Sequence, residues 1–187
     1  PDGARGITLN GGFLAFLSFD LWTRQPFNTD FDAGSIIDGA IVGGSLSADG
    51  QHLLVGLATG ELRLYDMPFT GELAQYKDEV TLQSGMALSP DGQVLITGTW
   101  DGRALWWDTE TQALIRETSG LGATVGNIGF SPDGKWVYIG ACDWGGICIS
   151  QSLLLDAQTG EIVHELVGME YVPRSHDFSP DGRLLLT

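Results

Sequence analysis

A four-residue turn recurs along this chain at nearly regular spacing, and this repetition constrains the fold more than any other feature. It reads Ser47-Ala48-Asp49-Gly50 once and Ser-Pro-Asp-Gly at residues 89–92, 131–134 and 179–182, and residues 1–3 give a shortened copy. The successive aspartates are separated by 47, 42, 42 and 48 residues, at Asp2, Asp49, Asp91, Asp133 and Asp181. Proline presets φ, aspartate bonds to nearby backbone and glycine adopts a positive φ, so each copy predicts a tight turn. A period of this length is typical of solenoids, propellers and related repeat folds.

Short apolar runs follow each turn and fit β-strands. The clearest copies are residues 51–56 with 61–66, and residues 93–98 with 103–108, and each second run ends in aspartate. A third run follows a polar turn, and a fourth leads into the next repeated turn, as at residues 125–130. Four short strands per period without helical periodicity predict one four-stranded antiparallel blade.

The ends of these strands resemble those of the WD-repeat family. Trp107-Asp108 is the dipeptide that names the family, and Asp20, Asp66 and Asp156 close the equivalent strands after Phe19, Tyr65 and Leu155. The resemblance implies a β-propeller in which a turn aspartate, Asp101, joins Thr97 or Thr99 and Trp107 in a buried hydrogen-bond network. The family's Gly-His dipeptide is missing throughout, so these repeats are degenerate and similar to bacterial-type members.

The predicted fold is therefore an all-β propeller with four four-stranded antiparallel blades. We expect residues 1–187 to form one segment, with blade periods at approximately 1–47, 48–89, 90–131 and 132–179 and the start of a further blade at 180–187. The last run takes the place that residues 7–9 hold in the first period, so the two would compete in a four-bladed ring. Closed propellers of this kind more often have seven or eight blades, which predicts an arc of a larger propeller. Self-assembly with a second copy to complete the ring is the alternative.

The charge balance restricts the class of partner. The chain has 24 Asp and Glu residues against 9 Lys and Arg residues, a net charge of −15. Such a surface repels phosphate backbones and anionic headgroups, which argues against a nucleic-acid partner. Apolar runs long enough to span a bilayer are also missing, so we predict a soluble, acidic chain without membrane insertion. Another protein, or another domain of the same chain, is the expected partner.

A lengthened hairpin in the fourth period contains both cysteines of the chain. If Trp144 lies at its tip, Cys142 and Cys148 face each other across the ladder, at a separation near the short end of disulfide geometry. A disulfide would indicate an extracytoplasmic compartment, whereas two unlinked thiols would fit the cytoplasm, and the sequence leaves both open. The tip and the loop before the last turn form a candidate interaction patch on one propeller face, composed of Trp144, Tyr171, Arg174 and His176. Packed positions for Trp144 and His176 are the alternative.

Catalytic motifs are not found. The sequence has no Gly-x-Ser-x-Gly elbow, no His-Glu-x-x-His and no phosphate-binding glycine loop, and its three histidines fall in separate periods. Residues 28–34 have oxygen-bearing side chains at alternate positions, as a calcium-binding loop does. The position of the glycine and the residue at the twelfth position do not fit such a loop. We therefore predict no cofactor, no metal and no enzymatic activity, and a scaffold that binds a partner through loops on one face. The alternative is a hydrolase-associated or cofactor-binding propeller with active residues outside this segment.

Overall fold

A computed structural model describes residues 8–10, 13–15, 18–19, 26–27, 41–47, 51–66, 71–77, 82–121, 124–142, 150–167 and 175–187. These residues form strands and tight turns, and none of them is helical. Within the same residues there is accordingly no apolar helix that could cross a membrane. The predicted all-β class is confirmed.

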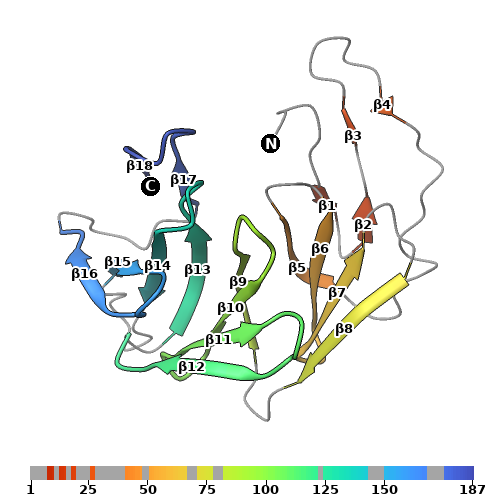
Figure 1. The fold of residues 1–187 in the computed structure, drawn as a ribbon, viewed down its shortest axis with the longest axis horizontal. Coiled ribbons are helices and arrows are strands. Elements are labelled where there is room, and N and C mark those ends of the chain that lie inside the picture. Colours follow the sequence, from red (N-terminus) through yellow and green to blue (C-terminus); the bar gives the residue numbers. More distant parts are fainter. Residues whose placement is uncertain are drawn as a thin grey trace.

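Among the described residues, three antiparallel sheets have four strands each, and in every one the strands pair in chain order. Sheet I consists of β5 (Ile41–Leu46), β6 (His52–Leu57), β7 (Glu61–Asp66) and β8 (Gly71–Lys77). Sheet II consists of β9 (Leu82–Leu88), β10 (Val94–Thr99), β11 (Ala104–Asp108) and β12 (Leu114–Thr118). Sheet III consists of β13 (Thr124–Phe130), β14 (Trp136–Cys142), β15 (Ser150–Asp156) and β16 (Ile162–Glu165). The sheets stand side by side around an open arc, with the first strand of each toward the inside (Figure 1).

Shorter pairs of strands lie at the two ends of this arc (Figure 1). In the first period, β1 (Thr8–Asn10) pairs with β2 (Phe13–Ala15), and β3 (Ser18–Phe19) pairs with β4 (Pro26–Phe27). At the other end, β17 (Asp177–Phe178) and β18 (Leu185–Leu186) form a two-stranded sheet, which we call the C-terminal hairpin. The arrangement is that of a β-propeller fragment.

The blades are offset by one strand from the periods predicted from the sequence. The predicted periods group residues 82–88 with the period that ends at residue 89, but β9 pairs with β10 across the Ser-Pro-Asp-Gly turn. β13 likewise pairs with β14 and not with sheet II. The repeated turn is a tight connection between neighbouring strands of one sheet, whereas the step to the next sheet is made by the segment before β9 or β13. The repeated turn therefore lies within a blade and not at the boundary between two blades.

Hydrogen bonds within the repeated turn explain its composition. The serine hydroxyl donates to the aspartate at 2.6, 2.7 and 2.6 Å in the copies that begin at Ser89, Ser131 and Ser179. The same hydroxyl accepts the backbone N–H five residues later, at 2.9 Å in each copy. The turn glycines have φ of 73°, 71° and 68°, a region that favours glycine. The serine side chain thus links the turn aspartate to the strand that follows the turn, and this role was not predicted from the sequence.

Apolar side chains fill the space between adjacent sheets. β6 and β10 are buried along almost their whole length, and sheet II is packed between sheets I and III. One core cluster joins Leu54, Leu62 and Leu64 of sheet I to Leu105 and Trp107 of sheet II. A second cluster joins sheet II to sheet III and includes Trp106 and Ile139. Alternate residues of β11 therefore contact opposite neighbours.

Candidate functional site

One end of the sheets carries the turns between second and third strands. In sheet II this turn is Trp100-Asp101-Gly102, and the loop that leads to sheet III reaches it through Leu121, whose N–H donates to the Gly102 carbonyl at 3.1 Å. The Thr124 hydroxyl donates to the Trp100 carbonyl at 3.4 Å. We call this end, formed among the described residues by 58–60, 100–103 and 119–121, the hairpin-turn face.

Trp100 is the exposed aromatic residue of this face. It is 46% exposed, although it lies between two strands whose apolar residues are almost all buried. A side chain in a tight turn belongs to neither face of the sheet, so strand alternation does not bury it. The sequence pattern predicted a role for the adjacent Asp101 and none for Trp100, although Trp100 stands in the same Thr-Trp-Asp-Gly turn.

Charged and polar neighbours hold the Trp100 turn in place. Arg103 Nε donates to both carboxylate oxygens of Asp101, at 3.0 and 2.9 Å, and Arg103 Nη1 donates to Glu117 at 3.3 Å. The Thr99 hydroxyl also donates to Asp101. The hydrogen bond from Arg103, and then that from Thr99, lowers the pKa of Asp101. The turn is therefore a rigid support for the tryptophan.

The buried network that the family resemblance implied is present only in part. Asp101 bonds to Thr99, and Trp107 Nε1 donates to Thr97 Oγ1 at 3.0 Å within the core. The two hydrogen bonds lie on different residues of β10, and no histidine stands between them in the sequence of this period. Thr99 and Thr97 thus take part in two separate hydrogen bonds, where the resemblance implied a single network.

The aspartates of the repeat act as turn and cap residues. Asp91, Asp133 and Asp181 each accept a backbone N–H two residues later, at 3.1, 3.2 and 3.1 Å. Hydrogen bonds from Lys135 and Ser131 lower the pKa of Asp133 to about 2. Asp108 and Asp156 accept backbone N–H groups of the turns that follow β11 and β15, and Asp66 ends β7 opposite His52. Asp49 lies outside the described residues.

Most of the predicted interaction patch also lies outside the described residues. Trp144, Tyr171, Arg174 and Cys148 belong to this group, and so does the side chain of Cys142. The backbone of Cys142 pairs with Ser150 at the described end of this hairpin. The disulfide itself stays a prediction.

His176 occupies the packed position of the two alternatives. Its Nδ1 lies 2.8 Å from Asn127 Oδ1 of β13, and its ring is 4.8 Å from that of Tyr138. A Cβ on Gly129 would lie 1.8 Å from His176 Nε2, so the imidazole lies directly against this glycine. Burial lowers the pKa of His176, and the charge of Asp177 partly opposes this. The ring also lines a cavity of about 440 Å³ between the inner strands β5, β9 and β13.

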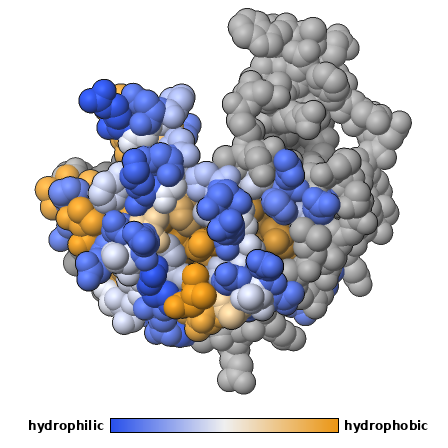
Figure 2. All heavy atoms as spheres, viewed as in Figure 1, coloured by the Kyte–Doolittle hydropathy of each residue, from blue (hydrophilic) through white to orange (hydrophobic). Residues whose placement is uncertain are grey.

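Apolar residues also reach the outer edge of the molecule, where orange atoms gather over the positions of β12 and β16 (Figure 2). These exposed residues are Leu114, Ile115, Ile162 and Val163. Within the residues that the structure places, no three His, Cys, Asp or Glu side chains gather in a way that could hold a metal ion.

Comparisons with known proteins agree with this architecture. Residues 72–108 match the family described as WD domain, G-beta repeat. The match extends from β8 to the last residue of β11, so it too crosses from one sheet to the next. The resemblance to the WD-repeat family is therefore confirmed in this part of the chain. A search of curated proteins finds no match.

Solved structures that resemble the chain are numerous, with 1326 matching chains. One of them is Kuenenia stuttgartiensis hydrazine synthase, with a TM-score of 0.67 and 23% sequence identity. The similarity covers 76% of this chain and 40% of that one, so the chain spans less than half of the enzyme's length. At this identity the likeness shows the fold alone, because one fold supports many functions.

Proposed function

We propose that this chain is a non-catalytic interaction scaffold that binds a partner protein, or another domain of the same chain, through the hairpin-turn face. The observation that carries the proposal is the exposure of Trp100 on a turn fixed by Asp101 and Arg103. WD repeats generally mediate protein–protein interactions, and residues 72–108 match such a repeat. The whole segment, residues 1–187, would serve as one rigid arc of a larger propeller.

The chemistry of the face fits a protein partner. Tryptophan and arginine are enriched among residues that dominate binding energy, and a rigid aromatic loses little conformational entropy on binding. Arg103 is already paired with Asp101 and Glu117, so the charges around Trp100 form a polar rim. An apolar centre within a polar rim is the usual arrangement of a protein interface.

The lengthened hairpin would extend the same face. Residues 143–149 connect β14 and β15 of sheet III, which is the connection that carries Trp100 in sheet II. Residues 168–174 lead from sheet III to the C-terminal hairpin, as 119–123 lead from sheet II to sheet III. The proposal therefore includes Trp144, Tyr171 and Arg174 as further contacts.

Replacement of Trp100 tests the proposal. The chain would be used as bait against extracts of its source, and the affinity of the strongest recovered partner would then be measured by calorimetry. Trp100→Ala should weaken that affinity about 30-fold or more, as expected for a central aromatic residue. Ile115→Ala, which removes a 52% exposed side chain on the outer edge of sheet II, is the matched control and should leave it unchanged. Equal affinities of the two variants would contradict the proposal that the partner binds through the hairpin-turn face.

A further inference from the structure

β12 and β16 are the outermost strands of sheets II and III, and each begins with two exposed apolar residues. Leu114 and Ile115 of β12 are 49% and 52% exposed, and Ile162 and Val163 of β16 are 50% and 40% exposed. Successive strand residues point to opposite faces, so a packed sheet normally buries one of such a pair. Sheet II is packed between sheets I and III and still leaves both residues exposed. The exposure is therefore a property of the outer edge itself.

A β-bulge places the two apolar residues of β12 on one face. The register pairs Leu105 with Glu117 and Trp107 with Leu114, so partners that are two residues apart on β11 are three apart on β12. Glu117 and Leu114 therefore share the face of Leu105 and Trp107. Ile115 is two residues from Glu117, and by alternation it lies on this face as well. The bulge thus sets Leu114 and Ile115 side by side.

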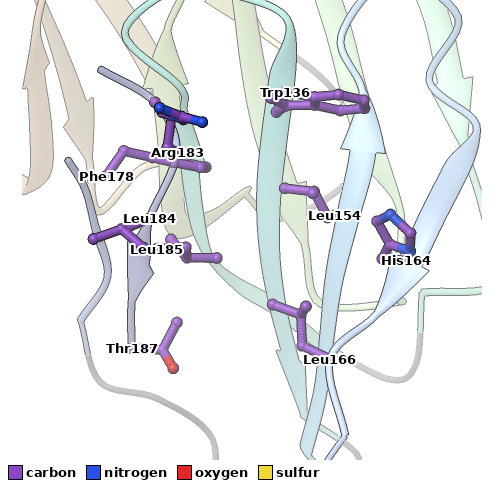
Figure 3. A pocket seen from close by; sticks show the side chains of 10 residues that line it. Trp136, Leu154, His164, Leu166, Phe178, Arg183, Leu184, Leu185 and Thr187 are labelled. Atoms are coloured by element: carbon purple, nitrogen blue, oxygen red, sulfur yellow. The ribbon is translucent and has the colours of Figure 1, made fainter. Parts of the chain in front are cut away.

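Sheet III repeats this arrangement, with a bulge of β16 at the same place. His164 and Leu166 line a cavity of about 450 Å³ between sheet III and the C-terminal hairpin (Figure 3). By alternation, Val163 and Glu165 lie on the opposite face of β16, which is turned toward sheet II. Ile162 shares that face, because it is paired with a residue of the cluster between sheets II and III. Two neighbouring outer strands therefore present the same apolar pair followed by glutamate.

The edge of sheet II also directs backbone groups outward. In an antiparallel ladder, alternate residues bond to one neighbouring strand and the residues between them point to the other side. The Thr99 N–H donates to the Arg103 carbonyl at 3.0 Å, which turns the odd-numbered residues of β11 toward β10. The even-numbered residues of β11 therefore bond to the residues opposite them on β12, which include Arg116. Ile115 and Glu117 consequently direct their N–H and C=O groups away from β11.

The exposed charge along these edges is acidic. In residues 109–118 and 157–167 the exposed Asp, Glu, Lys and Arg side chains are all glutamates, namely Glu110, Glu117, Glu161 and Glu165. The arginine of these ranges, Arg116, is half-buried, and its guanidinium lies over Trp106 and donates to the Gln158 carbonyl at 2.6 Å. With a net charge of −15, a second copy of the chain is repelled from this edge and a basic segment is attracted.

We propose that the outer edge of sheet II is a strand-addition site for a basic, extended segment of a partner protein. The outward backbone groups of Ile115 and Glu117 require an extended main chain, so a helix would not satisfy them. The segment would pair antiparallel with β12, with Lys or Arg opposite Glu117 and β-branched residues opposite Ile115 and Leu114. The edge of sheet III would accept the same kind of segment. This surface is separate from the hairpin-turn face, so the proposal goes beyond the proposed function and stands independently of it.

A peptide with the sequence Thr-Lys-Thr-Val-Val-Thr tests the site, because it can place its lysine opposite Glu117 and its valines opposite Ile115 and Leu114. Binding to the full chain, labelled with ¹⁵N, would be followed at each amide by NMR. At a peptide concentration about four times the dissociation constant, exchange of the Ile115 and Glu117 amides with solvent should slow about fivefold. The Arg116 amide, already bonded to β11, should change little. This alternation distinguishes strand addition from contact between side chains alone.

Two control peptides test the chemistry of the segment. Serine in place of both valines should weaken binding at least about tenfold, since the apolar pair of β12 loses its partners. Glutamate in place of the lysine should weaken it about threefold or more, because like charges then stand opposite each other. Equal affinities of the three peptides would overturn the proposal.

Variants of the chain locate the binding. Glu117→Lys should weaken binding of the lysine peptide at the β12 amides about threefold, and the glutamate peptide should restore it. Glu110→Lys makes the same change of charge in the turn before β12 and is the matched control that should leave binding unchanged. The amides of Val163 and Glu165 report on the unaltered edge of sheet III in both variants. Trp100→Ala should also leave peptide binding unchanged, which separates this site from the hairpin-turn face.

Three results would contradict the assignment. If the peptide binds without slowing exchange at Ile115 and Glu117, it does not add a strand to β12. If Glu110→Lys weakens binding as much as Glu117→Lys does, the peptide responds to the net charge and not to this edge. If sedimentation shows that the chain self-associates and that Ile115→Ser makes it monomeric, the occupant is a second copy and not a basic partner.

Discussion

The junction between sheets II and III and the junction between sheet III and the C-terminal hairpin use the same repeat positions but differ in packing. At the first, Trp106 is 0% exposed, with Phe130 edge-on at 6.5 Å and the Arg116 guanidinium 5.1 Å above its ring. At the second, Leu154 occupies the equivalent position and borders a cavity of about 450 Å³. The burial of a repeat position is therefore determined by the neighbouring sheet and not by the residue itself.

Polar contacts between the sheets follow the same difference. Arg116 Nη2 donates to the Gln158 carbonyl at 2.6 Å and the Thr118 hydroxyl donates to the Gly160 carbonyl at 3.5 Å, so the outer edge of the first junction is closed as well as its core. The second junction has the hydrogen bond between His176 and Asn127, near the inner strands. The first junction should behave as a stable unit, and the second should open more readily.

Removal of the equivalent side chains should give the largest contrast between the junctions. Trp106→Ala is expected to lower the free energy of unfolding by about 3–5 kcal/mol, because it leaves a large cavity between two complete sheets. Leu154→Ala should lower it by about 1 kcal/mol or less, since the side chain is only half-buried. Urea unfolding followed by tryptophan fluorescence and far-UV circular dichroism measures both values. Similar losses for the two variants would show that the second junction is as well packed as the first.

Added methyl groups should separate the junctions by a smaller amount. A Cβ on Gly98 would lie 2.2 Å from the Val125 carbonyl oxygen, which is backbone of the next sheet, so Gly98→Ala should destabilise by about 1–3 kcal/mol. Gly129→Ala would meet His176 Nε2, the end of a side chain that can move aside, and should cost less. Gly126→Ala has open space within 4 Å and is the control that should be nearly neutral. A larger effect at Gly129 than at Gly98 would reverse the expected order.

The sequence predicted the fold well because its signals are local. The Ser-Pro-Asp-Gly turn and the strand ending in Trp107-Asp108 depend on neighbouring residues, and both occur as predicted. The blade to which β9 belongs was predicted wrongly because strand pairing is non-local. The residues of a strand do not specify which neighbouring strand it pairs with. The exposure of Trp100 and the partial burial of Leu154 likewise depend on whether another sheet covers them. Burial and pairing across blades thus had to come from the structure.

A change of pH should give the smallest contrast and act on the second junction alone. Burial against β13 lowers the pKa of His176 in the folded chain, below the ordinary value of about 6.5 that it has when the hairpin is detached. The detached state therefore takes up a proton first, and the stability of the docked hairpin is complete above about pH 6.5 and falls as the pH drops toward the lowered pKa. The hydrogen-bonded carboxylates Asp133 and Asp181 have lowered pKa values and stay charged over this range.

Hydrogen exchange between pH 7 and pH 5.5, corrected for intrinsic rates, measures this effect. Protection of the β17 and β18 amides should decrease at the lower pH, while that of β10 and β11 stays constant. His176→Gln keeps a donor for Asn127 but removes the titration, so protection of the hairpin should no longer depend on pH. His164→Gln, which removes the histidine of β16 beside the cavity of about 450 Å³ at the second junction, is the matched control and should retain the dependence. A parallel loss of protection in β10 and β17 would mean that the two junctions open as one unit, and the difference in packing between them would then have no dynamic consequence.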